Sequence, residues 1–159
     1  MQGIDDCHVP SSLLKLWLRE LEDPLIPEGL YNECLEAAPD PERAIDIVKR
    51  LPTINKRVLL FVISLLQLFL QENIQAITKM NSVNLALVMA PNLLRCNSDL
   101  MMTVFTNTQY VYQCRKRSSP DASHLLLNRH EHTFVHTLLM HLKPHRIDPE
   151  YIPKHGLAR

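Results

Sequence analysis

Two charged side chains stand out in this 159-residue chain as groups that could recognise a partner. Lys15 and Arg19 are four residues apart in SLLKLWLRELE, so in a helix they project from one face about one turn apart. A pair of this kind fits a phosphate or a carboxylate on a partner molecule. The alternative is a solvated face whose charge is neutralised by the nearby acids Glu20, Glu22 and Asp23.

Two amides occur in the apolar run NLALVMAPNLLR, residues 84–95. Asn84 stands at the start of this run, where asparagine commonly caps a helix. Pro91 disturbs helical hydrogen bonding just before Asn92, which predicts a kink or a helix end there. The amide of Asn92 then either points outward to a partner or satisfies freed backbone carbonyls inside the fold.

A group of histidines in RHEHTFVHTLLMH offers a third candidate site. His132 and His136 are four apart and could chelate a metal from one helical face, beside His130 and His141. The segment is not an H-E-x-x-H motif and supplies no evident third ligand, so a polar helical face is the preferred interpretation. We therefore expect no metal.

Composition and charge narrow the functional classes. Three glycines cannot form the clustered loops that cradle nucleotides, so we expect no cofactor. Seventeen basic and seventeen acidic side chains give no net charge, which argues against nucleic acid as a partner. The four cysteines form no C-x-x-C pair, the N-terminus resembles no secretory signal, and the longest apolar run falls well short of the roughly 18 residues of a spanning helix. These features predict a cytoplasmic protein without membrane insertion.

Apolar spacing predicts an all-α fold. We expect helices over residues 12–22, 30–38, 41–51, 55–73, 84–95, 98–108 and 131–142. The helix over 55–73 carries apolar residues nearly all round its cylinder, which predicts that it is the central helix. Residues 111–130 show no sustained period and are predicted to be a loop or an insertion. Three prolines after residue 143 predict a loose tail over 146–159.

The pair of motifs LLKLWLRELEDPLIP and NLALVMAPNLLR resembles the core of the Rho-type GTPase-activating domain. Among its members the chain is most similar to the Vilse or cross-GAP kind, whose domains continue with LR and a cysteine, as LLRC does here. The resemblance runs from about His8 through Thr108 and resumes at Glu131 to Leu142.

The resemblance implies an all-helical domain that docks on the switch regions of a Rho-family small GTPase (Rac, Cdc42 or Rho) and promotes GTP hydrolysis, in signal transduction and cytoskeleton regulation. It places Lys15 at the GTPase contact, gives Arg19 the task of steadying the catalytic loop, and expects Asn92 to hydrogen-bond the GTPase near its switches, with Asn84 supporting that surface. GTP and Mg²⁺ would be carried by the partner. The chain would then be a monomeric regulator rather than an enzyme with its own active site.

Two departures from the family pattern qualify this expectation. The catalytic arginine of the family lies in a loop resembling G-I-F-R-x-x-G before the LLK helix, and no such loop precedes Lys15. Residues 111–130 interrupt what resembles the last helices of the domain. We therefore expect an N-terminally truncated domain over 1–145 that lacks its opening helix and arginine finger, and hence impaired activation; a fragment, a splice form or an imperfect gene model would each give this pattern. The alternatives are a non-catalytic GTPase-binding module and a helical scaffold.

Overall fold

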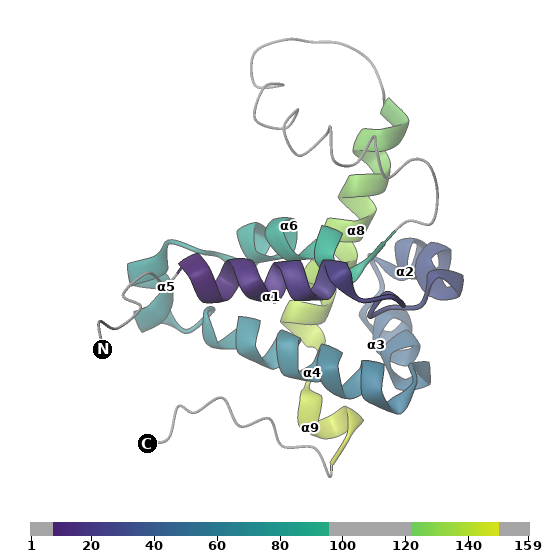
Figure 1. The fold of residues 1–159 in the computed structure, drawn as a ribbon, viewed down its shortest axis with the longest axis horizontal. Coiled ribbons are helices and arrows are strands. Elements are labelled where there is room, and N and C mark those ends of the chain that lie inside the picture. Colours follow the sequence, from purple (N-terminus) through teal and green to yellow (C-terminus); the bar gives the residue numbers. More distant parts are fainter. Residues whose placement is uncertain (1–7, 96–121, 150–159) are drawn as a thin grey trace.

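The structure is a computed structural model, and it describes residues 8–95 and 122–149. Its described part is helical throughout and contains no strand, which confirms the predicted all-α fold class (Figure 1). The helices, in chain order, are α1 (His8–Glu20), the short 3₁₀ helix η1 (Glu28–Leu30), α2 (Tyr31–Ala37), α3 (Pro41–Arg50), α4 (Thr53–Leu68), α5 (Glu72–Thr78), α6 (Ser82–Leu93), α8 (Ala122–His141) and α9 (Pro144–Ile147).

Local sequence signals fix several helix boundaries. The α1 helix begins at His8, earlier than predicted, because Pro10 falls within its first turn, where the missing N–H has no intrahelical partner to lose. The α3 helix starts as predicted at Pro41, and the Asp40 side chain caps it by accepting from the backbone N–H groups of Glu42 at 3.0 Å and Arg43 at 3.3 Å.

The central helix is α8 and not α4, so the prediction for residues 55–73 was wrong. The α8 helix packs against α2, α3, α4 and α6 (Figure 1). Its buried apolar residues are Phe134, Val135, Leu138, Leu139 and Leu142. The α4 helix buries one stripe only: its Phe61 remains 38% exposed, and the chain leaves the helix after Leu68 to form the separate α5. Apolar residues all round α4 therefore do not mean that other helices surround it.

Two further sequence predictions are corrected. Residues 122–130, predicted as part of a loop or insertion, belong to α8, which begins at Ala122. Residues 144–147, which overlap the predicted tail, form α9, and Ile147 packs against the core. Arg57 Nε on α4 donates to Asp148 Oδ2 at 2.9 Å and holds this end of the chain against the bundle. The predicted helix over 98–108, residues 111–121 and residues 150–159 lie outside the described residues.

Side-chain amides and hydroxyls bind backbone carbonyls that packing alone would leave unsatisfied. Gln67 Nε2 on α4 donates to Leu139 O and Leu142 O at 2.9 Å each and so caps the last turn of α8. Thr137 Oγ1 donates to Ala38 O at 2.7 Å, which joins α8 to the end of α2. None of the described helices is by itself long and apolar enough to cross a bilayer, and α4 with α5 passes that test only as a pair bent by 80°.

One ionisable group is buried where α8 meets α2. Glu131 is 5% exposed, and the Tyr31 hydroxyl donates to its Oε1. Desolvation raises the pKa of the Glu131 carboxyl above its ordinary value, while the hydrogen bond from Tyr31 acts in the opposite sense. The folded chain therefore holds this proton more tightly than the unfolded chain does.

This raised pKa predicts a pH dependence of stability. The stabilisation from protonated Glu131 is fully present below its ordinary pKa of 4.5 and is lost as pH rises through the raised value. Glu131→Gln keeps an acceptor oxygen for Tyr31 and cannot ionise. In urea unfolding between about pH 4 and pH 8, we expect the free energy of unfolding of the wild type to fall relative to this variant. A difference that stays constant with pH would contradict the assignment, and Glu72→Gln on the exposed start of α5 is the matched control.

Candidate functional site

The α1 helix presents two different flanks on either side of its buried edge. Leu18 is fully buried, and Leu14, one turn earlier, is half-buried. With 3.6 residues per turn, Lys15 and Arg19 share one flank and Trp17 lies on the other. Lys15 is half-buried and Arg19 exposed, so both charged groups reach solvent from a helix anchored by its apolar edge.

The cationic flank of α1 faces α6. Figure 1 shows α1 between α6 and α4, and α1 packs against α6. Trp17 lines a groove with α4, so the opposite flank, with Lys15 and Arg19, lies on the α6 side. The two sequence motifs, nearly seventy residues apart, therefore lie on neighbouring helices.

Lys15 and Arg19 form no ion pair with any acid among residues 8–95 and 122–149. In the described part of the chain, Glu20, Glu22 and Asp23 make no direct ion pair with Lys15 or Arg19, and a solvated face needs none. Like charges at this spacing repel each other by a few tenths of a kcal/mol in an isolated helix.

The outward face of α6 is mostly apolar. Asn84, Leu87, Val88 and Pro91 follow the i, i+3, i+4, i+7 spacing of one helical face. Leu87 is 43% exposed and Val88 is 41% exposed. Asn84, one turn closer to the start of α6, is also exposed. We call these four residues the α6 outer face. An exposed apolar stripe with one amide is typical of a surface that binds another protein.

Asn84 does not cap α6, contrary to one of the two roles considered for it. The cap is Asn81, whose side-chain oxygen accepts from the backbone N–H of Asn84 at 2.8 Å. The Asn84 amide is left on the exposed face, as a docking role requires.

Asn92 does not point outward, so that expectation was wrong. Its residue is 5% exposed, and its Nδ2 donates to Val88 O at 2.7 Å. Pro91 has no N–H for Leu87 O, whereas the Asn92 amide binds the next carbonyl, Val88 O. The amide therefore points into the fold and binds backbone there, as in the second alternative from the sequence, although the carbonyl it reaches is not the one that Pro91 frees.

The histidines of α8 do not converge on one point. His130 Nδ1 lies 3.2 Å from Leu35 O, and His136 Nε2 lies 3.1 Å from Ser82 Oγ. Burial lowers the pKa of His132. Across the described ranges, no three His, Cys, Asp or Glu side chains gather into a possible metal site. His136 also has no carboxylate partner in these ranges, so Ser82 and His136 do not form a catalytic triad there.

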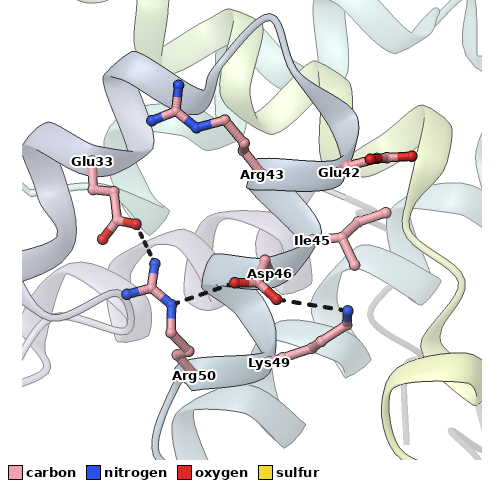
Figure 2. Close-up of a pocket in the computed structure, with 7 residues that line it drawn as sticks. All are labelled: Glu33, Glu42, Arg43, Ile45, Asp46, Lys49 and Arg50. Carbon is pink, nitrogen blue, oxygen red and sulfur yellow. Dashed lines mark hydrogen bonds and ion pairs between the residues drawn. The ribbon is translucent and has the colours of Figure 1, made fainter.

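A second hollow, of about 620 Å³, lies between α2 and α3 and is shown in Figure 2. Most of its charges are paired: Arg50 binds Glu33 and lies 3.9 Å from Asp46, which is 3.8 Å from Lys49. Burial raises the pKa of the adjacent Cys34 thiol to about 12, so it is protonated at neutral pH and a poor nucleophile. This hollow shows no group prepared for chemistry.

Comparison with known proteins identifies the arrangement. A model of the RhoGAP domain matches residues 2–98, a range that contains both α1 and α6. The chain belongs to the RhoGAP domain family. Its fold is similar to the crystal structure of the BH domain from Graf, the GTPase regulator associated with focal adhesion kinase, with a TM-score of 0.65 and 19% identity over 94% of this chain and 69% of that one.

Two relatives of this RhoGAP chain are much longer proteins. GTPase activating protein homolog 2 of Dictyostelium discoideum is 46% identical over 98 residues, which cover 62% of this chain and 11% of that protein. Human Rho GTPase-activating protein 30 is 36% identical over 121 residues, which cover 72% of this chain and 11% of that protein. The chain therefore spans about a tenth of the length of these relatives.

Sequence reasoning missed Arg95, which follows Asn92 by three residues. Its guanidinium donates to backbone carbonyls at the C-terminal end of α1 and beyond it. The only signal in the sequence is a basic residue directly after the apolar part of NLALVMAPNLLR, and such a residue usually lies in solvent.

The burial of Asn92 leads to a prediction about stability. Asn92→Ala removes the donor to Val88 O and should lower the free energy of unfolding by about 1–3 kcal/mol. Asn84→Ala, a matched control on the exposed face of the same helix, should change it by less than about 0.5 kcal/mol. Chemical unfolding of both variants measures the difference. Equal effects would mean that the Asn92 amide is not bonded internally.

Proposed function

We propose that this RhoGAP chain docks on the switch regions of a Rho-family GTPase in its GTP-bound state, through the α1 cationic flank and the α6 outer face. The observation that carries the proposal is the adjacency of these two helices within the segment that matches the RhoGAP model. GTP and Mg²⁺ belong to the partner, and the chain acts as a monomer.

Each part of the surface has a physical task. Lys15 and Arg19 supply cationic donors for carboxylates or phosphates of the GTPase, and charge-assisted hydrogen bonds of this kind are about twice as strong as neutral ones. Leu87 and Val88 supply apolar area that loses water on contact. Asn84 supplies a neutral donor and acceptor that fixes orientation without the desolvation penalty of a charge.

The chain as it stands is proposed to bind better than it activates. Its first arginine is Arg19, so no arginine precedes Lys15 in a glycine-bearing loop. An arginine finger accelerates GTP hydrolysis by roughly 10³ to 10⁵ because it neutralises charge that develops on the transferred phosphoryl group. Residues 1–159 alone therefore orient the switches with little acceleration, and sequestration of the GTPase is the second candidate function.

We further propose that the chain is related to the Vilse or cross-GAP kind, because its LLRC segment matches theirs. We also propose a cytoplasmic role in signalling that acts on the cytoskeleton.

Single-turnover hydrolysis with GTP-loaded Rac, Rho and Cdc42 type GTPases tests this function. With the chain in excess, we expect saturable binding and a rate increase far below the roughly thousandfold minimum expected of an arginine finger. The GDP-bound GTPases are the matched control and should bind more weakly, because their switch regions lose the contacts to the γ-phosphate. A thousandfold or greater increase in the hydrolysis rate would overturn the proposal that this chain lacks an arginine finger. No binding to any of the three GTPases would favour the alternative that the chain is a helical scaffold.

The role of Lys15 gives a separate prediction. Lys15→Ala should weaken binding of the GTP-loaded GTPase by about ten- to hundredfold, because a hydrogen bond to a charged group is lost. The melting temperature should hardly change, since alanine favours helix. Lys143→Ala, at an exposed lysine after α8, is the control and should leave binding unchanged. Titration by fluorescence anisotropy measures both, and a fall in melting temperature equal in proportion to the loss of binding would assign Lys15 to the fold instead.

A further inference from the structure

The α1 helix has little apolar packing to fix its position. Leu18 is its one buried side chain among the residues whose burial is described, and Leu14 is half-buried. On the α4 side a groove of about 380 Å³ separates the two helices, lined by Leu14, Trp17, Arg57, Val58, Phe61 and Val62. Trp17 is 50% exposed in this groove. Packing on that side therefore does little to set how α1 rotates or slides along α6.

The side chain of Arg95 joins the C-terminal ends of α1 and α6. Arg95, two residues after α6 ends, donates through Nη1 to Arg19 O at 3.1 Å. Its Nη2 donates to Leu21 O and also lies 3.4 Å from Glu22 O. These hydrogen bonds connect residues more than seventy positions apart in the chain, and they act where α1 stops.

The chemistry of this contact favours arginine. The last carbonyls of a helix lack intrahelical donors and carry partial negative charge, so a cation there is stabilising. A planar guanidinium can serve several carbonyls from fixed directions, whereas a lysine ammonium offers one compact charge. In the part of the chain that the structure describes, Arg95 Nε is buried and has no hydrogen-bond partner. The guanidinium is half-buried, and its two Nη atoms bind one carbonyl of the last turn of α1 and two just beyond it.

We propose that Arg95 is a positioning residue for the cationic flank of α1. It binds the carbonyl of Arg19 itself and two carbonyls just beyond, so it fixes the rotation of the last turn of α1 and with it the direction of Lys15 and Arg19 relative to the α6 outer face. The expected effect of Arg95 on GTPase binding rests on the proposed function. The immobilisation of α1 by Arg95 does not depend on any partner.

Two measurements on Arg95→Gln and Arg95→Lys test the proposal. Hydrogen exchange of α1 amides, measured without a GTPase, should be faster in Arg95→Gln by about ten- to hundredfold, with Arg95→Lys between that variant and the wild type. Affinity for the GTP-loaded GTPase should fall by about tenfold in Arg95→Gln. Arg43→Gln, which removes an exposed arginine of α3 that lies 3.9 Å from Glu36, is the matched control and should change neither quantity.

A double-mutant cycle separates positioning from general destabilisation. If Arg95 acts through α1, Lys15→Ala should weaken binding less in the Arg95→Gln background than in the wild type, because the lysine is already misplaced there. Additive effects of Lys15→Ala and Arg95→Gln would overturn the proposal, as would unchanged α1 exchange in Arg95→Gln. A wild-type chain that binds no GTPase would instead remove the proposed function, and the exchange measurement would still decide whether Arg95 holds α1.

Discussion

The structure depends on the burial of one face of α8. Phe134, Val135 and Leu138 are fully buried where α8 meets its neighbours, and α2, α3, α4 and α6 each pack against this helix. Apolar surface removed from water contributes roughly 25 cal/mol per Å², so a helix buried by four others is the main source of stability in a bundle of short helices. Of the helices that do not pack on α8 in this way, α9 packs against α4, η1 against α2 and α1 against α6.

This order of dependence explains where polar groups are used. Near α8, two side-chain amides and one hydroxyl bind backbone carbonyls: Gln67 at the end of α8, Thr137 at the end of α2, and Asn92 in α6 beside its proline. Burial separates each of these carbonyls from water, and a buried carbonyl without a hydrogen bond would cost about 1–3 kcal/mol of stability. The side chain supplies the hydrogen bond instead. The interior is therefore specified by polar contacts at helix ends as well as by apolar volume.

The candidate site lies at the edge of this packed region. The α6 outer face is carried directly on a helix that touches α8, whereas the cationic flank belongs to α1, which reaches the core mainly through Leu18 and is joined to α6 by Arg95. In the proposed function, the position of the weakly anchored α1 relative to the α6 outer face controls recognition of the GTPase. Both helices lie within the segment that matches the RhoGAP domain.

The sequence by itself determined the helical class, the start of α3 at Pro41 and the two motifs that carry the family resemblance, because apolar spacing, capping residues and proline act within a few residues of one another. It also limited Asn92 to two orientations. Only the tertiary structure decided between them, made α8 central instead of α4, extended α8 back to Ala122, and showed that Arg95 binds carbonyls at the end of α1. Those outcomes depend on which surfaces meet across many tens of residues, and a local pattern does not contain that information.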